Sequence, residues 1–370
     1  MRQGARAKRT GIAGVLSSLI VAAGFVVLTA GPAAATVFSS AAAITIPVNG
    51  VAAPYPSPIT VSGLSGTIVD VNVNLTGMNH TFTSDIDILL VGPAGQKVVL
   101  MADVGANLDL VGVNLTFDDA AAASLTAAQV VSGTFKPSVL AGGGFIGVPP
   151  APLPPYGTTL AGFNATAPNG TWNLFVYDDA GGDSGSISGG WSLDILATPT
   201  ITSFAPTSGA VGATVVITGT SLTGTSAVSF HGIPAVSFTV DSATQVTATV
   251  PAGASTGPIS LTTPGGTTAS ATNFVVQHAR DVSLTLAGNK AKGTVNVTDG
   301  FLPCRSGVPV KLQHLKNGNW KTVGSTLTKA DGTYTVPGVT DPGKYRSVAK
   351  KTTLSAGDVC LKDISPKDSK

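Results

Sequence analysis

The sequence predicts an all-β protein, and two features of its composition carry that prediction. All 19 acidic residues are Asp, so Glu, a good helix former, is absent. The 45 Gly and 24 Pro separate short runs in which apolar and polar residues alternate. No long amphipathic helical pattern interrupts these runs. We therefore expect several small β-sandwiches in series.

The first 35 residues are predicted to be a targeting segment. Four basic residues lie within the first nine, an almost uncharged apolar run covers 11–30, and Ala33, Ala34 and Ala35 supply a small-residue cleavage site. The run approaches the length of a membrane span, so an uncleaved anchor is the alternative. We favour cleavage, which predicts a chain without a membrane span that is either secreted or associated with the cell surface.

Charge divides the rest of the chain into three segments, which we interpret as modules. Residues 36–197 hold eleven Asp and two Lys, residues 198–277 hold one Asp, and residues 278–370 hold fifteen Lys and Arg against seven Asp. The basic segment suits anionic polymers such as cell-wall glycans, although a solvated surface is the simpler interpretation. It lacks the Arg and aromatic interleaving of a nucleic-acid module, so we expect no nucleic-acid partner.

In the first module, period-two alternation predicts strands over 69–75 and 86–90. The turn sequence Gly92-Pro93-Ala94-Gly95 then predicts a hairpin that returns over 98–101. Residues 119–162 are rich in Ala, Gly and Pro and are expected to form a long surface excursion, in which 148–155 cannot pair as a central strand.

The later modules show short strand patterns at intervals of 8–12 residues, which is typical of small β-sandwiches. In the second module the predicted strands cover 201–209, 212–219, 228–230, 246–250, 257–263 and 271–274. In the third module they cover 308–313, 320–323, 332–336 and 344–346, and the residues after Leu361 are expected to be loose. For Trp320, which follows a turn, the core is favoured over an exposed contact.

An aspartate-rich connection joins two strands that begin with Trp. Trp172 and Trp191 each open an alternating apolar pattern, which predicts that both rings lie in the core. Between the strands lie Asp178, Asp179 and Asp183. Crowded carboxylates repel one another unless a cation lies among them, so a cation site is the first hypothesis. The alternative is that these Asp residues cap turns.

The first module resembles the P/Homo B domain of subtilisin-like proprotein convertases. The residues that carry the likeness, within about 37–196, are His80-Thr81, Ser84-Asp85, Pro93-Ala94-Gly95, Asn169-Gly170-Thr171-Trp172, Asp178, Asp183, Gly185 and Trp191-Ser192-Leu193. The resemblance implies a jelly-roll β-sandwich that binds calcium, with Asp85, Asp178 and Asp183 at the family's acidic positions and Asp87 and Asp179 as neighbours that assist. Calcium takes six to eight oxygen ligands, which Asp side chains and carbonyls of Gly-rich turns can supply. The inserted region 119–162 departs from the family pattern.

The second module, 198–277, resembles the IPT/TIG immunoglobulin-like fold. Pro206-Thr207-Ser208-Gly209, Gly212, Ile217-Thr218-Gly219 and Val228-Ser229-Phe230 carry this likeness. Such domains serve mostly as spacers or protein-contact modules, so the resemblance implies no site. The third module, 278–370, is similar to bacterial immunoglobulin- or transthyretin-like surface modules through Val308 to Leu312 and Asp331 to Tyr334.

Cys304 and Cys360 are the two cysteines of the chain. An even count in an exported protein predicts a disulfide, with two free thiols as the alternative. Two cysteines without a nearby His cluster are too few for a zinc site.

One tetrapeptide of the chain matches a catalytic motif. Gly182-Asp183-Ser184-Gly185 matches the sequence around the nucleophile of trypsin-like proteases, and His80 precedes it. A nucleophilic Ser needs a base within hydrogen-bond reach. Because this motif lies inside the Trp-framed pattern, we expect His80 to be a packed, hydrogen-bonded residue and the chain to be no enzyme.

Taken together, the sequence predicts a secreted, non-catalytic, calcium-stabilised binding or scaffolding protein of the bacterial exterior. Its partner would be an extracellular protein or glycan. The alternative is an accessory role in an extracellular, serine-type proteolysis system with a protease as partner, as P domains serve in convertases.

Overall fold

The fold was analysed in a computed structural model that describes residues 35–140, 144–145 and 147–370. The predicted all-β class is confirmed, because strands dominate and the helical elements are short 3-10 turns. The targeting segment predicted at the N-terminus lies outside the described residues, apart from Ala35. Within the described part of the chain, no helix has the length and apolar character needed to span a membrane.

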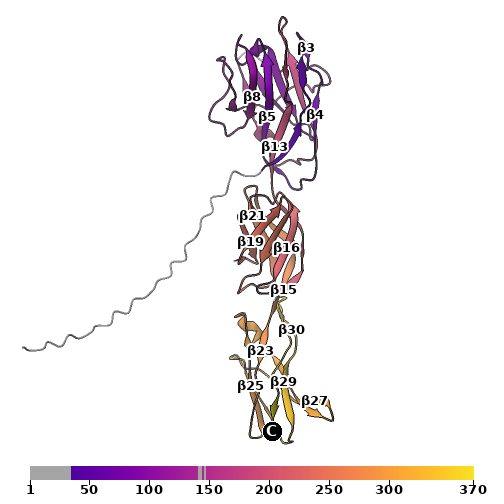
Figure 1. Cartoon of the computed structure of the whole chain (residues 1–370), viewed down its shortest axis with the longest axis vertical. Coiled ribbons are helices and arrows are strands. Elements are labelled where there is room, and N and C mark those ends of the chain that lie inside the picture. Colours follow the sequence, from indigo (N-terminus) through magenta and orange to yellow (C-terminus); the bar gives the residue numbers. More distant parts are fainter. Residues whose placement is uncertain (1–34, 141–143, 146) are drawn as a thin grey trace, which may run out of the picture. The chain divides into compact units, whose positions relative to one another are not determined.

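The first module is a sandwich of two sheets (Figure 1). The seven-stranded sheet contains β1 (Thr36–Ser40), β2 (Ile44–Ile46), β5 (Ile68–His80), β8 (Leu110–Phe117), β9 (Gly133–Phe135), β12 (Gly185–Ile187) and β13 (Trp191–Ala197). The six-stranded sheet contains β3 (Gly50–Val51), β4 (Ser57–Val61), β6 (Ile86–Val91), β7 (Lys97–Ala102), β10 (Ser138–Val139) and β11 (Gly170–Asp178). Two 3-10 turns, η1 (Thr83–Asp85) and η2 (Leu160–Phe163), complete the module.

The core of this module lies between the sheets, as the Trp-led patterns predict. Trp172 and Trp191 are 0% and 2% exposed, and they come from different sheets, β11 and β13. Each buried indole N–H has a partner, the carbonyl of Pro168 for Trp172 and the hydroxyl of Ser57 for Trp191, both at 3.0 Å. The core therefore holds its two largest side chains without leaving a buried donor unsatisfied.

The prediction that 119–162 is only a surface excursion is wrong. The described part of this region contributes the edge strands β9 and β10, and it also places Phe145 and Ala151 on the outer face of the six-stranded sheet. There they join Leu89 and Phe175 in a second apolar cluster. The apolar residues scattered through the Gly- and Pro-rich sequence cover a sheet face that would otherwise be exposed.

The second module also has two sheets. One contains β14 (Thr200–Ala205), β16 (Thr214–Thr220), β19 (Phe238–Ser242) and β20 (Gln245–Thr249). The other contains β15 (Ser208–Ala210), β17 (Ala227–Phe230), β18 (Ile233–Pro234), β21 (Gly257–Thr263) and β22 (Gly266–His278), extended by β30 (Thr352–Thr353) and β31 (Val359–Cys360). Its core contains Phe230 and Phe274, whose ring centroids lie 5.3 Å apart.

The third module contains two further sheets and the turn η3 (Leu302–Cys304). One sheet contains β23 (Arg280–Val282), β24 (Thr285–Ala287), β25 (Lys290–Val297) and β28 (Thr333–Pro337). The other contains β26 (Pro309–Lys316), β27 (Asn319–Leu327), β29 (Lys344–Ala349), β32 (Asp363–Ile364) and β33 (Asp368–Ser369). The predicted disulfide is present between Cys304 and Cys360.

Two expectations for the third module are corrected. The residues after Leu361 are not loose, because β32 and β33 both pair with β29, and the carboxylates of Asp363 and Asp368 accept backbone N–H groups of Val282 and Leu286. Trp320 is half-buried and lies outside the core cluster. Its position on β27, opposite Leu315, places it away from the core side of the sheet.

Candidate functional site

The five aspartates predicted to bind calcium divide between two groups at the ends of β6 and β11. Asp178 pairs with Ile86, a core residue, so its side chain points toward the core. Asp87 pairs with Tyr177, which packs against the outer apolar cluster, so its side chain points away from the core. Successive residues of a strand point to opposite faces, and this separates the two carboxylates.

The inner group consists of Asp85, Asp178 and Asp183, and hydrogen bonds within the protein occupy its carboxylates. Asp178 lies 3.1 Å from Nε2 of His80 and accepts the backbone N–H of Ala180. Asp183 accepts the hydroxyl of Thr81. Burial, followed by the charge of Asp178, raises the pKa of Asp85. Burial also raises the pKa of Asp178, and the hydrogen bond from His80 opposes that shift.

His80 belongs to this hydrogen-bond network and not to a catalytic triad. It is 2% exposed, and its ring nitrogens lie 3.1 Å from Asp178 and 2.9 Å from the carbonyl of Phe82. Ser184 is exposed, and no hydrogen bond recorded for the described residues joins it to an imidazole. The prediction that His80 is a packed, hydrogen-bonded residue is confirmed.

The outer group consists of Asp87, Asp103 and Asp179, and its central carboxylate is unsatisfied. Asp87 is 1% exposed, and neither of its carboxylate oxygens has a hydrogen-bond partner among the described residues. Burial raises the pKa of Asp87 to about 8, and the negative charges of Asp179 and Asp103 add to that shift. Asp179 is exposed and Asp103 is half-buried, so solvent reaches the group from one side.

Asp103 was not among the sequence-predicted ligands. It follows β7 directly, and β7 pairs antiparallel with β6 in the hairpin that the Gly-Pro-Ala-Gly turn predicts. In that register the end of β7 lies beside the start of β6, so Asp103 is close in space to the strand end that contains Asp87. The hairpin pattern in the sequence therefore contained the signal that would have found it.

The outer group supplies only oxygen donors, which suits a hard cation such as calcium better than zinc or copper. Because neither buried oxygen of Asp87 has a donor among the described residues, its ionised form is uncompensated, and either a proton or a bound cation would relieve that cost. Within the described residues, however, no three His, Cys or Asp side chains lie close enough together to form a ready-made metal cage.

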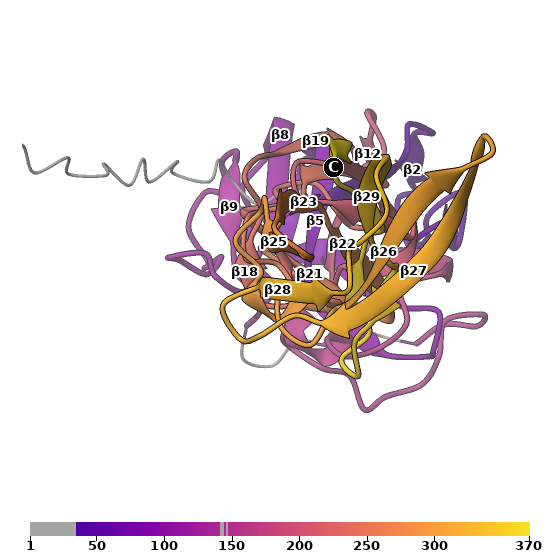
Figure 2. The same ribbon diagram turned by 90° about the horizontal axis from the view of Figure 1, so that it is seen from below.

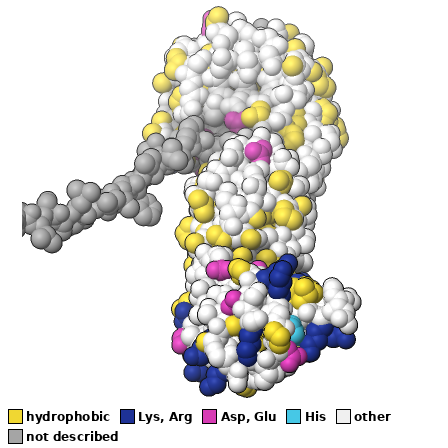
Figure 3. Space-filling model, turned by 60° about the horizontal axis from the view of Figure 1, so that its bottom comes forward, with side chains coloured by type: hydrophobic (Ala, Val, Ile, Leu, Met, Phe, Trp, Pro, Cys, Tyr) yellow, Lys and Arg dark blue, Asp and Glu magenta, His cyan; other side chains and the backbone are white. Residues whose placement is uncertain are grey.

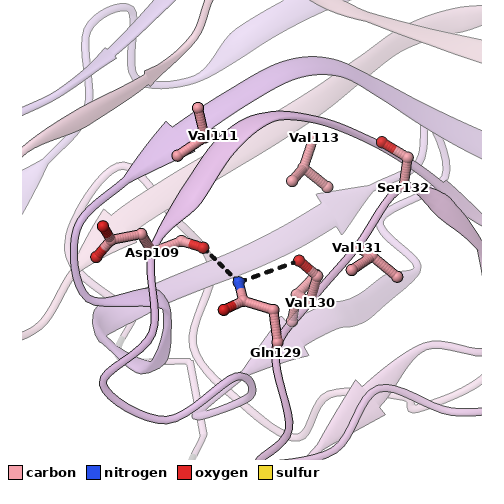
Figure 4. A pocket seen from close by; sticks show the side chains of 7 residues that line it. All are labelled: Asp109, Val111, Val113, Gln129, Val130, Val131 and Ser132. Atoms are coloured by element: carbon pink, nitrogen blue, oxygen red, sulfur yellow. Dashed lines mark hydrogen bonds between the residues drawn. The ribbon is translucent and has the colours of Figure 1, made fainter.

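A separate shallow pocket of about 400 Å³ lies beside β8 in the first module (Figure 4). The amide of Gln129 spans it by donating hydrogen bonds to the backbone carbonyls of Asp109 and Val130. Val111 and Val131 are strongly exposed at its rim, at 79% and 58%. The remaining lining residues are Val113 and Ser132. With one charged lining residue, the pocket offers apolar contact and few groups for chemistry.

Several solved structures are similar to parts of the chain. A surface glycan-binding protein of Prevotella bryantii is 14% identical, with a TM-score of 0.25 and coverage of 46% of this chain and 42% of that one. A Bacteroides ovatus glycan-binding protein, solved with a mixed-linkage heptasaccharide, is 16% identical, with a TM-score of 0.19 and coverage of 56% and 54%. A cyclodextrin glucanotransferase from Bacillus clarkii is 17% identical, with a TM-score of 0.20 and coverage of 56% and 30%. Similarity this weak does not bear on function.

No curated protein matches the chain significantly in sequence. One family model does match, and it covers the second module. The prediction made from the Pro206 to Gly209 and Ile217 to Gly219 motifs is therefore confirmed for that module. Residues 199–276 form an IPT/TIG domain.

Proposed function

We propose that this chain is an exported, non-catalytic binding or scaffolding protein whose first module is a P/Homo B-like sandwich stabilised by calcium. The observation that carries the calcium proposal is the buried carboxylate of Asp87, which has no hydrogen-bond partner among the described residues and whose pKa is raised by burial and by the charges of Asp179 and Asp103. Asp87, Asp103 and Asp179 would supply carboxylate oxygens to the ion. Asp85, Asp178 and Asp183, with His80, would hold the ends of β6 and β11 in place.

Calcium would act on stability and not on chemistry. An ionised, buried carboxylate without a partner destabilises the folded state, and a bound divalent cation removes that cost. Any ligand that binds only the folded state also stabilises it by mass action. The cation would therefore hold together the corner where β6, β7 and β11 end.

Thermal unfolding of the mature chain tests this proposal. Millimolar calcium is expected to raise the first melting transition at pH 8, and a chelator is expected to lower it. Asp87→Asn should abolish the difference, because it removes the charge that the ion neutralises. Asp109→Asn is the matched control, since it removes the same charge from an exposed position and should leave the calcium shift intact.

If calcium causes no shift in the wild-type chain, or if Asp87→Asn retains the full shift, the cation site is not at Asp87. Asp183→Ala provides an intermediate case. Its carboxylate is tied to Thr81, so its loss should weaken the shift through disorder of the connection and not remove it.

The exterior location and the binding role follow from the targeting segment, the disulfide and the IPT/TIG domain. Disulfides persist in oxidising compartments, and the Cys304–Cys360 bridge fits such a compartment. The partner would be an extracellular glycan or protein. The accessory role in proteolysis rests on the P/Homo B resemblance alone, and co-purification of a protease from culture medium would be needed to support it.

A further inference from the structure

The third module carries an excess of positive charge that its own carboxylates do not neutralise. Figure 3 shows Lys and Arg side chains gathered over this module. Among the described residues, one Lys–Asp ion pair is formed, between Lys316 and Asp341 at 2.7 Å. Most of the other carboxylates of the module are engaged by His278, by Thr333 or by backbone N–H groups.

Three of these cationic residues, Lys311, Arg346 and Lys350, lie along β26 and β29, with Lys350 directly after β29, in the sheet of β27, β26 and β29, whose strands are drawn in Figure 2. In β26, Val310, Leu312 and His314 are buried, so the alternate residues point outward. In β29, Tyr345, Ser347 and Ala349 are buried in the same way, and Val348, on the alternate side between Arg346 and Lys350, is also buried. We define the outer face as Lys311, Gln313, Trp320, Arg346 and Lys350.

Lys311 and Lys350 lie side by side at one end of the outer face. The backbone N–H of Lys350 donates to the carbonyl of Pro309, which fixes the chain beside the start of β26. Lys311 pairs across the strands with Val348, two residues before Lys350, and the neighbouring cationic side chain of Lys350 lowers the pKa of Lys311. No carboxylate of the described residues forms an ion pair with either side chain. Two adjacent ammonium groups repel each other unless an anion lies between them.

Arg346, Trp320 and Gln313 form a fixed cationic group at the other end. The guanidinium of Arg346 lies 4.3 Å from the centroid of the Trp320 ring, and its Nε donates to the side-chain oxygen of Gln313 at 2.8 Å. These two contacts hold the guanidinium in place before any ligand arrives. No hydrogen bond from its terminal nitrogens is recorded among the described residues, so they remain available as a planar fork for a carboxylate or phosphate.

We propose that the outer face binds an anionic glycan, a polysaccharide that carries carboxylate or phosphodiester groups along its chain. Residues two apart in a strand are separated by about 7 Å, so Lys311 and Gln313 present successive contact points to an extended polymer. One acidic group would lie between Lys311 and Lys350, and another would contact Arg346. The exposed part of Trp320 and the amide of Gln313 would contact the sugar rings between them.

A glycan fits this face better than a nucleic acid does. Single-stranded nucleic acids are bound by several aromatic side chains on which successive bases stack. The outer face has one aromatic residue, Trp320, and Arg346 already lies over its ring. The inference rests on the extracellular binding role proposed above and specifies the chemistry of its ligand.

Titration of the mature chain with defined polymers tests the inference. The probes are polygalacturonate and poly(glycerol phosphate), with neutral dextran and oligothymidylate for comparison. Lys311→Gln with Lys350→Gln is the test variant. Lys290→Gln with Lys292→Gln is the matched control, because it removes the same charge from exposed positions on β25, in the other sheet of the module. Trp320→Ala tests the sugar contact, and melting curves verify that each variant is folded.

We expect the wild-type chain to bind at least one acidic polysaccharide and not dextran. The Lys311/Lys350 variant should lose at least tenfold in affinity, the Lys290/Lys292 control less than twofold, and Trp320→Ala roughly threefold or more. Equal losses in both lysine variants would indicate unspecific attraction and contradict the inference. Tighter binding of oligothymidylate would replace the glycan by nucleic acid. Absence of binding to both acidic polymers would also overturn the inference, as would self-association of the chain through its acidic first module. The calcium-dependent shift in melting temperature tests the first module separately, so failure of one proposal can be distinguished from failure of the other.

Discussion

Asp87 is the residue on which the cation proposal depends. It is buried, both of its oxygens lack partners among the described residues, and the charges of Asp179 and Asp103 that raise its pKa are negative. Such a side chain is stable in the folded state only when it is protonated or when a cation is bound. In the absence of the ion, the folded protein should therefore retain a proton there at neutral pH.

This predicts how stability varies with pH in chelator. The pKa of Asp87 rises from 3.8 in the unfolded chain to about 8 in the folded one. Between pH 4 and pH 8 the folded state binds more protons, so the free energy of unfolding falls as pH rises, by up to about 1.4 kcal/mol per pH unit. Below pH 4 and above pH 8 Asp87 contributes no further slope. Urea unfolding at several pH values measures this, and Asp87→Asn should flatten the curve specifically in that window.

The sequence contained the signal that separates the two acidic groups, although the five aspartates were predicted as one set. Asp178 continues the alternation of Trp172, Leu174 and Val176, which places it on the core side. Asp87 alternates with Ile86 and Ile88, which places it on the opposite side. The pairing of His80 with Asp178 was beyond sequence reasoning, because 98 residues separate them and only the fold brings them together.

Among the elements, β12 fixes the position of the aspartate-rich connection that follows β11. Its first residue, Gly185, pairs with His80 on β5 and with Ile46 on β2. A Cβ atom at Gly185 would lie 2.0 Å from the carbonyl oxygen of Asn79 and 2.6 Å from the His80 ring. The strand can therefore approach β5 only because this position has no side chain.

Gly185→Ala is expected to detach β12 from β5 and to lower the free energy of unfolding by about 2–4 kcal/mol, as overpacking against backbone does. Gly181→Ala, in the same connection, is the control, because its Cβ would meet nothing closer than 3.9 Å. Amide hydrogen exchange of residues 185–187 measures the local effect. Equal protection in both variants would show that the close approach does not hold the strand.

Many strands were predicted from alternation and turn residues, whereas the eight-residue strands β8 and β25 and the pairing partners of the strands were not. The hairpin of β6 and β7 was predicted because Gly92 to Gly95 is a local turn signal. The edge strands β9, β10, β32 and β33 are two or three residues long, too short for a period-two pattern. Tertiary pairing creates them, which explains why 119–162 was expected to be a surface excursion and the residues after Leu361 to be loose.

At the scale of the whole molecule, each module has its own core and its own means of stabilisation. The first has the largest core and the third has the smallest described apolar cluster of the three, while the disulfide joins η3 of the third module to β31, which extends a sheet of the second. The bridge spans 56 residues, and in the chain-entropy model closing a loop of that length contributes roughly 4 kcal/mol.

Replacing Cys304 and Cys360 together by Ser should therefore lower the melting transitions of the second and third modules, which the bridge joins, and leave the calcium-dependent transition of the first unchanged. Differential scanning calorimetry of the mature chain, with and without calcium, distinguishes the two. A uniform decrease in all transitions would mean that the modules unfold as one unit.

Equilibrium binding of calcium is the decisive measurement for the cation site at Asp87. Terbium, which takes oxygen ligands as calcium does, should show luminescence sensitised by Tyr177, the cross-strand neighbour of Asp87. We predict saturable luminescence in the mature chain that calcium displaces and that Asp87→Asn abolishes. Absence of a saturable signal in the wild type, or an unchanged signal in Asp87→Asn, would contradict the claim that the outer aspartates hold a cation.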